Sequence, residues 1–276
     1  MKSYIDKLAI VVISTDSYSD SWDIFFESVN KNWSKASLNK YLFTDSLDYN
    51  SHGVITINPI KNEYSNALDW GGRLLSCLDQ INEENILFFL EDYILIKNVN
   101  NIELKSAIEY FFSKNIDFMT LGTHDTNRLS HRSNTDRYVK VKKFTKYRIT
   151  TAPAIWKKEY LKKYLIKGLN PWQFEILGSY FSFFCSGKLF SLNKMFFNLS
   201  HEIIPYFINN GLDSAIVRGK WQSEIKKHIE EKHIQLIEKR GFYDPLGNGI
   251  SKIDTIKKVL SNPFFIFRYF FKVIKS

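Results

Sequence analysis

The sequence predicts an α/β fold in which a mostly parallel, Rossmann-type sheet is flanked by helices and followed by a C-terminal helical extension. Two uninterrupted apolar runs, 8–13 and 86–90, are typical of strands that are buried on both faces. The segments around them place apolar residues at helical spacing, and repeated alternation of strand and helix favours a parallel sheet. A chain of 276 residues with 44% hydrophobic and 24% charged residues can bury the large core of a globular protein.

The first half of the chain alternates strands with helices, each identified by the spacing of its apolar residues. Expected strands are 8–14, 41–43, 54–57, 86–90 and 117–121, and expected helices are 22–29, 69–81 and 102–112. Polar or proline-containing turns close the two short strands. The helix over 69–81 leads directly into the second apolar run.

The second half is more varied. Segments 137–141 and 147–151 alternate polar and apolar residues around a basic turn, which predicts an antiparallel hairpin. Segment 171–184 opens with a proline suited to a first helical turn and is apolar nearly all round, so we expect a buried helix. Charged residues with spaced isoleucines over 221–240 predict a solvated amphipathic helix.

No low-complexity linker interrupts the chain, which we divide into a domain 1–220 and a helical extension 221–276. The last segment, 263–275, is too short to span a bilayer. Its Phe and Ile residues, punctuated by basic ones, suit the headgroup region of an anionic membrane. The alternative is a terminal helix that docks on its own domain or on a partner.

The net charge of +9 implies an anionic partner, for which nucleotide phosphate, nucleic acid and anionic lipid all qualify. Basic residues cluster at 137–148 and in the C-terminal tail, but no recognised nucleic-acid motif is present, so nucleic acid is the least favoured partner. Aromatic residues make up 16% of the chain, enough to fill a core or also to face carbohydrate or lipid headgroups.

The two cysteines, Cys77 and Cys185, show no disulfide framework or zinc spacing, which fits a reducing compartment. No signal peptide is visible before the first strand. We therefore expect a cytoplasmic protein held peripherally on the inner face of the cell membrane.

The second apolar run ends in two adjacent carboxylates, Glu91 and Asp92. In open α/β sheets, ligands bind at the carboxyl edge of the strands, where a metal ion or a sugar phosphate would need acidic groups. The alternative interpretation is a solvated strand end.

Four stretches of the sequence carry a resemblance. They are Val11-Val12-Ile13-Ser14-Thr15-Asp16, Tyr41-Leu42-Phe43-Thr44-Asp45, the helix with Trp70 and Arg73, and Leu90-Glu91-Asp92-Tyr93. Together they resemble the GT-A glycosyltransferases that assemble bacterial surface polysaccharides such as capsule, O-antigen or lipooligosaccharide. The resemblance covers roughly the first two thirds of the chain and implies a GT-A-like fold, a nucleotide-sugar donor and a divalent cation, Mg²⁺ or Mn²⁺.

The resemblance also implies roles for individual residues. Nucleotide-sugar contacts are expected from Ser14, Thr15, Asp16, Asp45, Glu91 and Tyr93. Independently of the resemblance, phosphate oxygens need cations, for which Arg73, Arg218 and Lys220 are candidates; each of them could instead be a surface charge. The family's acidic motif is Asp-any-Asp, whereas this chain has Glu91-Asp92-Tyr93. Hard cations prefer oxygen ligands, so we expect Asp92 as the direct ligand and Glu91 as a second ligand or sugar contact.

Other polar residues are weaker candidates. His201 could supply a late metal ligand, and His124 could also lie at the active edge, although histidines in loops are commonly inert. Lys142 and Lys143 are further candidates for phosphate contacts, and each of them could equally be a surface charge.

An inverting transfer needs a general base to take the proton of the acceptor hydroxyl. Glu175 is the candidate, because it is the only acidic residue between Glu159 and Glu202. The alternatives are a glutamate stabilised by the helix dipole or paired with a lysine. Trp172 beside it could stack on an acceptor sugar or fill the core.

These observations favour a membrane-associated glycosyltransferase that extends a lipid-linked or surface glycan from a nucleotide-activated sugar. The alternative is a non-catalytic scaffold or glycan- or lipid-binding protein of polysaccharide assembly.

Overall fold

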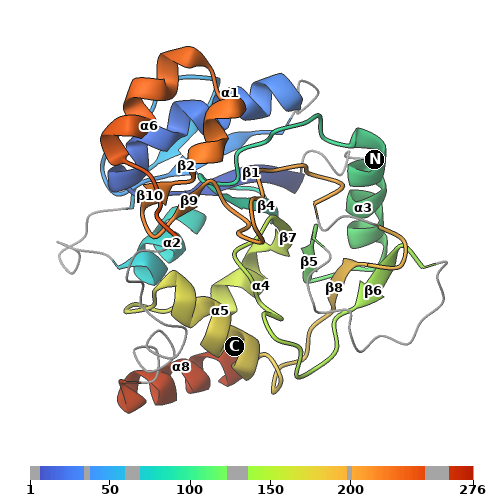
Figure 1. Cartoon of the computed structure of the whole chain (residues 1–276). Coiled ribbons are helices and arrows are strands. Elements are labelled where there is room, and N and C mark those ends of the chain that lie inside the picture. Colours follow the sequence, from blue (N-terminus) through green and yellow to red (C-terminus); the bar gives the residue numbers. More distant parts are fainter. Residues whose placement is uncertain are drawn as a thin grey trace.

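A computed structural model describes residues 7–33, 38–59, 69–122, 136–197, 201–245 and 261–275. Its centre is an eight-stranded mixed sheet with the order β3-β2-β1-β4-β7-β5-β8-β6 (Figure 1). The strands are β1 (Leu8–Ile13), β2 (Lys40–Phe43), β3 (Ile55–Ile57), β4 (Asn85–Leu90), β5 (Phe118–Thr120), β6 (Tyr138–Lys140), β7 (Ala154–Lys157) and β8 (Leu189–Leu192). A separate two-stranded ladder joins β9 (Ile216–Val217) to β10 (Lys220–Trp221).

The strands β3, β2, β1 and β4 run parallel, and their register brings three strand ends to one level: Ile13 lies opposite both Phe43 and Leu90. The antiparallel strand β7 joins this parallel half to β5, which pairs in parallel with β8. The predicted α/β class, a mostly parallel sheet flanked by helices with a helix at the C-terminal end, is thereby confirmed.

Helices cover both faces of the sheet. They are α1 (Trp22–Asn32), α2 (Trp70–Leu78), α3 (Asn101–Ser113), α4 (Lys158–Lys163), α5 (Pro171–Phe181), α6 (Ile234–Arg240) and α8 (Pro263–Lys275). Short 3-10 helices, η2 (Asp16–Ser21), η4 (Ser223–Lys227) and η5 (Glu231–His233), complete the set. Figure 1 shows α1, α3 and α6 on one side and α2, α4, α5 and α8 on the other.

The alternation of β1 explains the two hydrophobic cores. Ile10 and Val12 point into the core beneath α1, α3 and α6, whereas Val11 and Ile13 point into the core beneath α2, α4, α5 and α8. Every residue of β1 is buried, as expected for a strand that is covered on both faces. Each such aliphatic side chain contributes about 1.5–3 kcal/mol of burial free energy.

The predicted hairpin of 137–141 with 147–151 is wrong. β6 pairs instead with β8, and 147–151 forms no strand. The sequence analysis missed β7 and β8, which are only four residues long, and β7 lies at the centre of the sheet.

The single solvated helix predicted over 221–240 is also wrong. This segment contains the end of β10, the helices η4 and η5, and the short helix α6. Trp221 and Ile237 are fully buried in the core beneath α1. The segment beyond residue 220 is thus continuous with the main core.

The C-terminal helix α8 forms as predicted, and one of its faces packs on α5. No helix in the described ranges combines the length and the apolarity needed to cross a bilayer. His124 lies outside the described residues.

Candidate active site at the carboxyl edge of the parallel strands

The parallel strands β1, β2 and β4 end side by side, and the residues that follow them meet at one edge. Ser14, Thr44 and Glu91 follow the strand ends directly. The indole N–H of Trp22 donates to Ser14 Oγ at 2.7 Å, and Ser14 in turn lies within hydrogen-bonding reach of the Glu91 carboxylate. The Ser14 hydroxyl group thus joins the end of β1 to the acidic pair at the end of β4.

Glu91 and Asp92 form an acidic pair at this edge, in which Glu91 is buried and Asp92 is half-buried. Glu91 is 7% exposed. Burial raises the pKa of Glu91, and the neighbouring Asp92 carboxylate raises it further; burial likewise raises the pKa of Asp92. Asp92 Oδ1 is buried and has no hydrogen-bond partner in the described part of the chain. Two adjacent carboxylates with an unpaired oxygen are costly to bury unless a ligand compensates them.

A divalent cation fits this pair. Mg²⁺ is commonly held by one or two carboxylates together with substrate phosphates and water, and a cation beside the pair would offset the repulsion between the two carboxylates. No group of three His, Cys, Asp or Glu side chains with metal-binding geometry occurs among the described residues. The structure therefore does not join His201 to Glu91 and Asp92 as a third ligand. A cation here would take two protein ligands.

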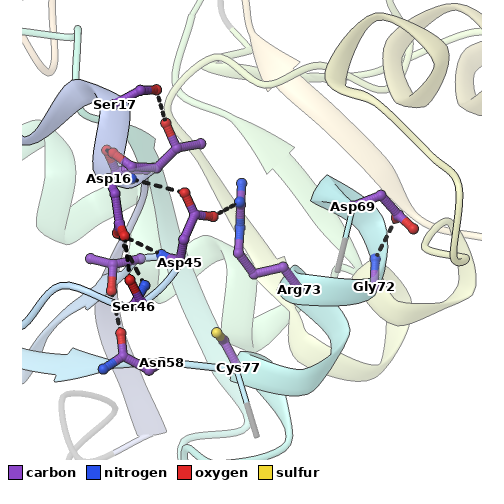
Figure 2. Close-up of polar contacts among 12 residues, drawn as sticks. Asp16, Ser17, Asp45, Ser46, Asn58, Asp69, Gly72, Arg73 and Cys77 are labelled. Carbon is purple, nitrogen blue, oxygen red and sulfur yellow. Dashed lines mark hydrogen bonds and ion pairs between the residues drawn. The ribbon is translucent and has the colours of Figure 1, made fainter. Parts of the chain in front are cut away.

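Asp16 and Asp45 tie the loops after β1 and β2 to each other (Figure 2). The Asp16 amide donates to Asp45 Oδ2 at 2.9 Å, and the Asp45 amide donates to Asp16 Oδ1 at 3.0 Å. Asp16 also accepts from the amides of Ser46 and Leu47 and from the Ser46 hydroxyl. Partial burial acts against ionisation of Asp16, but the bonds from Ser46 and Leu47 outweigh it and lower the pKa. Both carboxylates therefore act as structural hydrogen-bond acceptors.

Arg73 belongs to the same cluster. Its guanidinium pairs with Asp45, and the residue is only 7% exposed. Helix α2 positions it: the Asp69 carboxylate caps the helix by accepting from the Gly72 amide at 3.0 Å (Figure 2). A side chain at Gly71 would collide with the carbonyl of Ile166, so this approach requires glycine. Arg73, predicted to contact phosphate, pairs with Asp45 and so helps to orient the loop after β2.

Tyr93 is buried beside the acidic pair. Its ring packs edge-on against Tyr206 with centroids 4.8 Å apart, and the residue is 7% exposed. Burial raises the pKa of Tyr93 well above its usual value, and the charges of Asp92, Glu175 and Asp213 add to the rise. Tyr93 therefore forms the wall of the site, and its surroundings place Glu175 in the same electrostatic neighbourhood as Asp92.

Glu175 lies in α5, which begins with a reciprocal capping box between Asn170 and Gln173. Glu175 Oε1 accepts from the Thr151 amide at 2.7 Å, the Thr151 hydroxyl at 2.8 Å and the Thr150 hydroxyl at 3.1 Å. Threonine donors from the loop before β7, and not the lysine considered from the sequence, thus hold this carboxylate.

Trp172 lies one turn before Glu175 on α5 and is 62% exposed. Residues three apart on a helix lie on neighbouring parts of its surface. The indole is therefore available to a ligand that approaches the carboxylate, and the core-filling alternative does not hold.

Arg218 and Lys220 belong to the β9–β10 ladder. Arg218 and Gly219 have φ angles of 51° and 75°, which makes a two-residue hairpin turn with both central residues in the left-handed region. Arg218 lies over the Tyr243 ring, 5.9 Å from its centroid, and Lys220 Nζ donates to the carbonyl of Arg240. The predicted basic turn exists, with both cations exposed at its tip.

The structure adds Arg240 and Tyr18, which the sequence analysis missed. Arg240 pairs with Asp20 through two nitrogens and lies over the Tyr18 ring, 4.5 Å from its centroid. Its positive charge lowers the pKa of Glu91, against the effect of burial. No local motif marks Arg240, because its partners are about 220 positions away in the sequence.

Segment 213–215 also contacts the acidic pair. The Ala215 amide donates to the backbone carbonyl of Asp92 at 2.9 Å, and Ser214 lies within hydrogen-bonding reach of the Asp92 carboxylate. Asp213 is exposed beside them. A short polar stretch without periodicity gives no sequence signal for this contact.

No known protein family matches the chain, and no curated protein matches it. Among solved structures, the chain is similar to TarS of S. aureus, with a TM-score of 0.44 and 15% identity over 68% of this chain and 35% of that one. A shorter TarS structure in complex with UDP-GlcNAc gives 0.44 and 14%, over 96% of this chain and 72% of that one.

More distant similarities are to the bifunctional IspDF of Campylobacter jejuni, with a TM-score of 0.38 and 13% identity over 68% of this chain and 49% of that one. An active-site mutant of LgtC gives 0.36 and 9% over 62% and 64%. The chain spans about a third of the length of the first TarS structure. Similarities this distant carry no argument about function, so any assignment depends on the site.

Proposed function

We propose that this protein is a glycosyltransferase that moves a sugar, such as a hexose, from a nucleotide-activated donor to a lipid-linked or surface glycan. The observation that carries the proposal is the acidic pair at the carboxyl edge of the parallel strands, in which Glu91 is buried and the buried Asp92 Oδ1 has no hydrogen-bond partner among the described residues. Strand ends of this kind are where α/β sheets bind phosphorylated ligands. The resemblance in the sequence supports the same class of reaction.

The proposed reaction is an inverting displacement. The acceptor hydroxyl oxygen attacks the anomeric carbon, the bond from that carbon to the diphosphate oxygen breaks, and the hydroxyl proton passes to the Glu175 carboxylate. The Thr150 and Thr151 donors fix the orientation of this carboxylate, and Trp172 offers an exposed ring for stacking on the acceptor sugar.

The remaining residues serve the donor. A divalent cation held by Glu91 and Asp92 would neutralise the charge that develops on the departing diphosphate. Arg218 and Lys220, exposed at the β9–β10 hairpin, are the cations that we propose to contact its phosphate oxygens. Ser14, Thr15, Asp16 and Asp45 shape the edge against which the nucleotide would lie, with Asp16 and Asp45 acting through the loop backbones that they fix.

The setting we propose is surface-polysaccharide assembly, with the protein in the cytoplasm and peripheral on the inner face of the cell membrane. Exposed aromatic and basic side chains on α8 support a membrane location. The same side chains would also suit a non-catalytic scaffold that binds lipid or glycan.

Calorimetric titration of UDP, GDP, CDP and CMP into the purified protein separates these two functions. The transferase should bind one nucleotide selectively, and a scaffold should bind none. Absence of binding to all four nucleotides would overturn the proposed function.

A further inference from the structure

Helix α8 has an inner face that is fully engaged. Phe265, Tyr269 and Val273 are buried against the body of the protein. The Tyr269 hydroxyl donates to the carbonyl of Tyr164 at 2.8 Å, and Cys185 Sγ contacts the carbonyl of Val273 at 3.3 Å. The helix is therefore docked lengthwise on α5 and the segment after it, as Figure 1 shows for the red helix beside α5.

The outer face of α8 is apolar and uncovered. Phe264 is 75% exposed, Phe267 62%, Phe271 39% and Ile274 42%. These positions are three or four residues apart, so they follow one side of the helix. Single exposed apolar residues are ordinary, but a continuous row of large ones marks an interaction surface.

This row continues onto the end of α5, the segment that follows it and the segment around Phe144. The Phe184 ring meets the Phe270 ring at 5.6 Å, and Tyr180 lies 6.2 Å from Phe184. Phe183 then links Tyr180, at 5.5 Å, to Phe144, at 4.7 Å. We call the surface formed by these residues and the outer row of α8 the aromatic face. Its members come from three segments that are far apart in the sequence.

Positive charge surrounds the aromatic face. The exposed cations of its segments are Lys142, Lys143, Lys146, Arg268, Lys272 and Lys275. The sequence has no Asp or Glu in 137–158, 176–201 or 255–276. Lys143, from the basic cluster at 137–148, lies within electrostatic range of Cys185, beside α8, and so belongs to this face. Arg137 of the same cluster pairs instead with Glu103 on α3.

We propose that the aromatic face docks on a bilayer that contains anionic phospholipid. Surfaces that bind at the membrane interface typically combine aromatic rings, which lie at the depth of the headgroups, with lysines around them. Lysines near such a surface are attracted to anionic lipid. Protein interfaces, in contrast, are depleted in lysine, which argues against a protein partner.

The position of α5 gives this docking a consequence that rests on the proposed function. Glu175 and Tyr180 are five residues apart in one helix, about 8 Å along its axis. The proposed base therefore lies within about two helical turns of the lipid surface. An acceptor carried by a membrane lipid would reach it directly, whereas a glycan far from the bilayer would not.

The test is co-sedimentation of the full chain with vesicles of phosphatidylcholine alone and of phosphatidylcholine mixed with phosphatidylglycerol. We expect binding to the mixed vesicles only, weakening as salt is raised. The triple variant Phe264→Ser/Phe267→Ser/Phe271→Ser should weaken binding roughly tenfold or more. The variant Lys143→Glu/Lys272→Glu/Lys275→Glu should also weaken it roughly tenfold or more.

Matched controls are Ile102→Ser and Lys105→Glu on α3, where Ile102 is 81% exposed. Both should bind like the wild type, and all variants should keep its thermal unfolding midpoint. Wild-type binding by either triple variant, equal binding to neutral and anionic vesicles, or no vesicle binding would overturn the proposal. Nucleotide titration of the same variants should be unchanged, so failure of docking is distinguishable from failure of the transferase assignment.

Discussion

Asp16 and Asp45 each accept a hydrogen bond from the backbone amide of the other, at 3.0 and 2.9 Å. This reciprocal pair joins the loops after two parallel strands, and Arg73 neutralises it from α2 (Figure 2). The edge that would receive a nucleotide is consequently fixed before any ligand arrives. Preorganisation of this kind reduces the ordering cost of binding.

Replacing Asp16 tests this relationship. Asp16→Ala leaves the amides of Asp45, Ser46 and Leu47 without their acceptor, so we expect a loss of about 1–3 kcal/mol in the free energy of unfolding. Asp16→Asn retains one acceptor oxygen and should recover part of that loss. Urea denaturation measures both. As a control, Asp79→Ala removes an exposed ion pair with Lys162 and should cost less than about 1 kcal/mol. Equal stability of Asp16→Ala and the wild type would contradict the account.

Glu175→Gln tests the proposed base. The glutamine oxygen can still accept from Thr150 and Thr151, so the fold should be retained, but an amide cannot take up the acceptor proton. Sugar transfer should fall by about 10²–10⁴-fold while nucleotide affinity stays within error. Glu109→Gln, on the exposed side of α3, is the matched control and should be fully active. Transfer by Glu175→Gln at the wild-type rate would exclude this residue as the base.

The lowered pKa of Glu27 predicts how the stability of the protein falls at acid pH. Partial burial opposes its ionisation, but hydrogen bonds from Lys232 and His233 outweigh this and lower the pKa of Glu27 below its ordinary value of 4.5. A carboxyl with a lowered folded pKa contributes stability that is present above its unfolded pKa and is lost as the pH falls through the folded pKa.

The wild type should therefore lose stability below about pH 4.5, and the loss should be less steep in Glu27→Gln. Urea midpoints measured from neutral pH down to pH 3 check this expectation, with Glu109→Gln as the control that keeps the wild-type slope. Identical acid slopes for Glu27→Gln and the wild type would show that the contact contributes nothing.

The sequence predicted most of the parallel half of the sheet because its two central strands, β1 and β4, are six residues long and apolar on both faces, and helices with clear periodicity lie between them. β1 and β4 lie where expected, and the acidic pair follows β4 at the ligand-binding edge. β7 was missed, although the strand is central, because its four residues, Ala154–Lys157, run directly into α4 at Lys158 with no turn between them. Local patterning also cannot tell which strand β6 will pair with.

The site was predicted less completely, for a physical reason. Residues at strand ends, such as Glu91 and Asp92, could be predicted from the order of the strands. Contacts between distant segments were not: Arg240 reaches Asp20 across 220 positions, and the burial of Arg73 depends on its pairing with Asp45. The amphipathic character of α8 was evident, but its inner face is committed to α5, and only the outer face remains exposed.

The central claim is that Glu91 and Asp92 hold a cation and a nucleotide diphosphate together. Asp92→Asn should leave the fold intact, because the neutral isostere of this half-buried carboxylate removes a charge that is costly to hold away from water.

The most direct measurement is calorimetric titration of the selected nucleotide into the wild type and Asp92→Asn, each with Mn²⁺ and then with EDTA. The account predicts that Mn²⁺ tightens binding to the wild type by roughly tenfold or more, that EDTA abolishes the gain, and that Asp92→Asn shows no gain. The account would be contradicted if each protein bound the nucleotide as tightly with EDTA as with Mn²⁺.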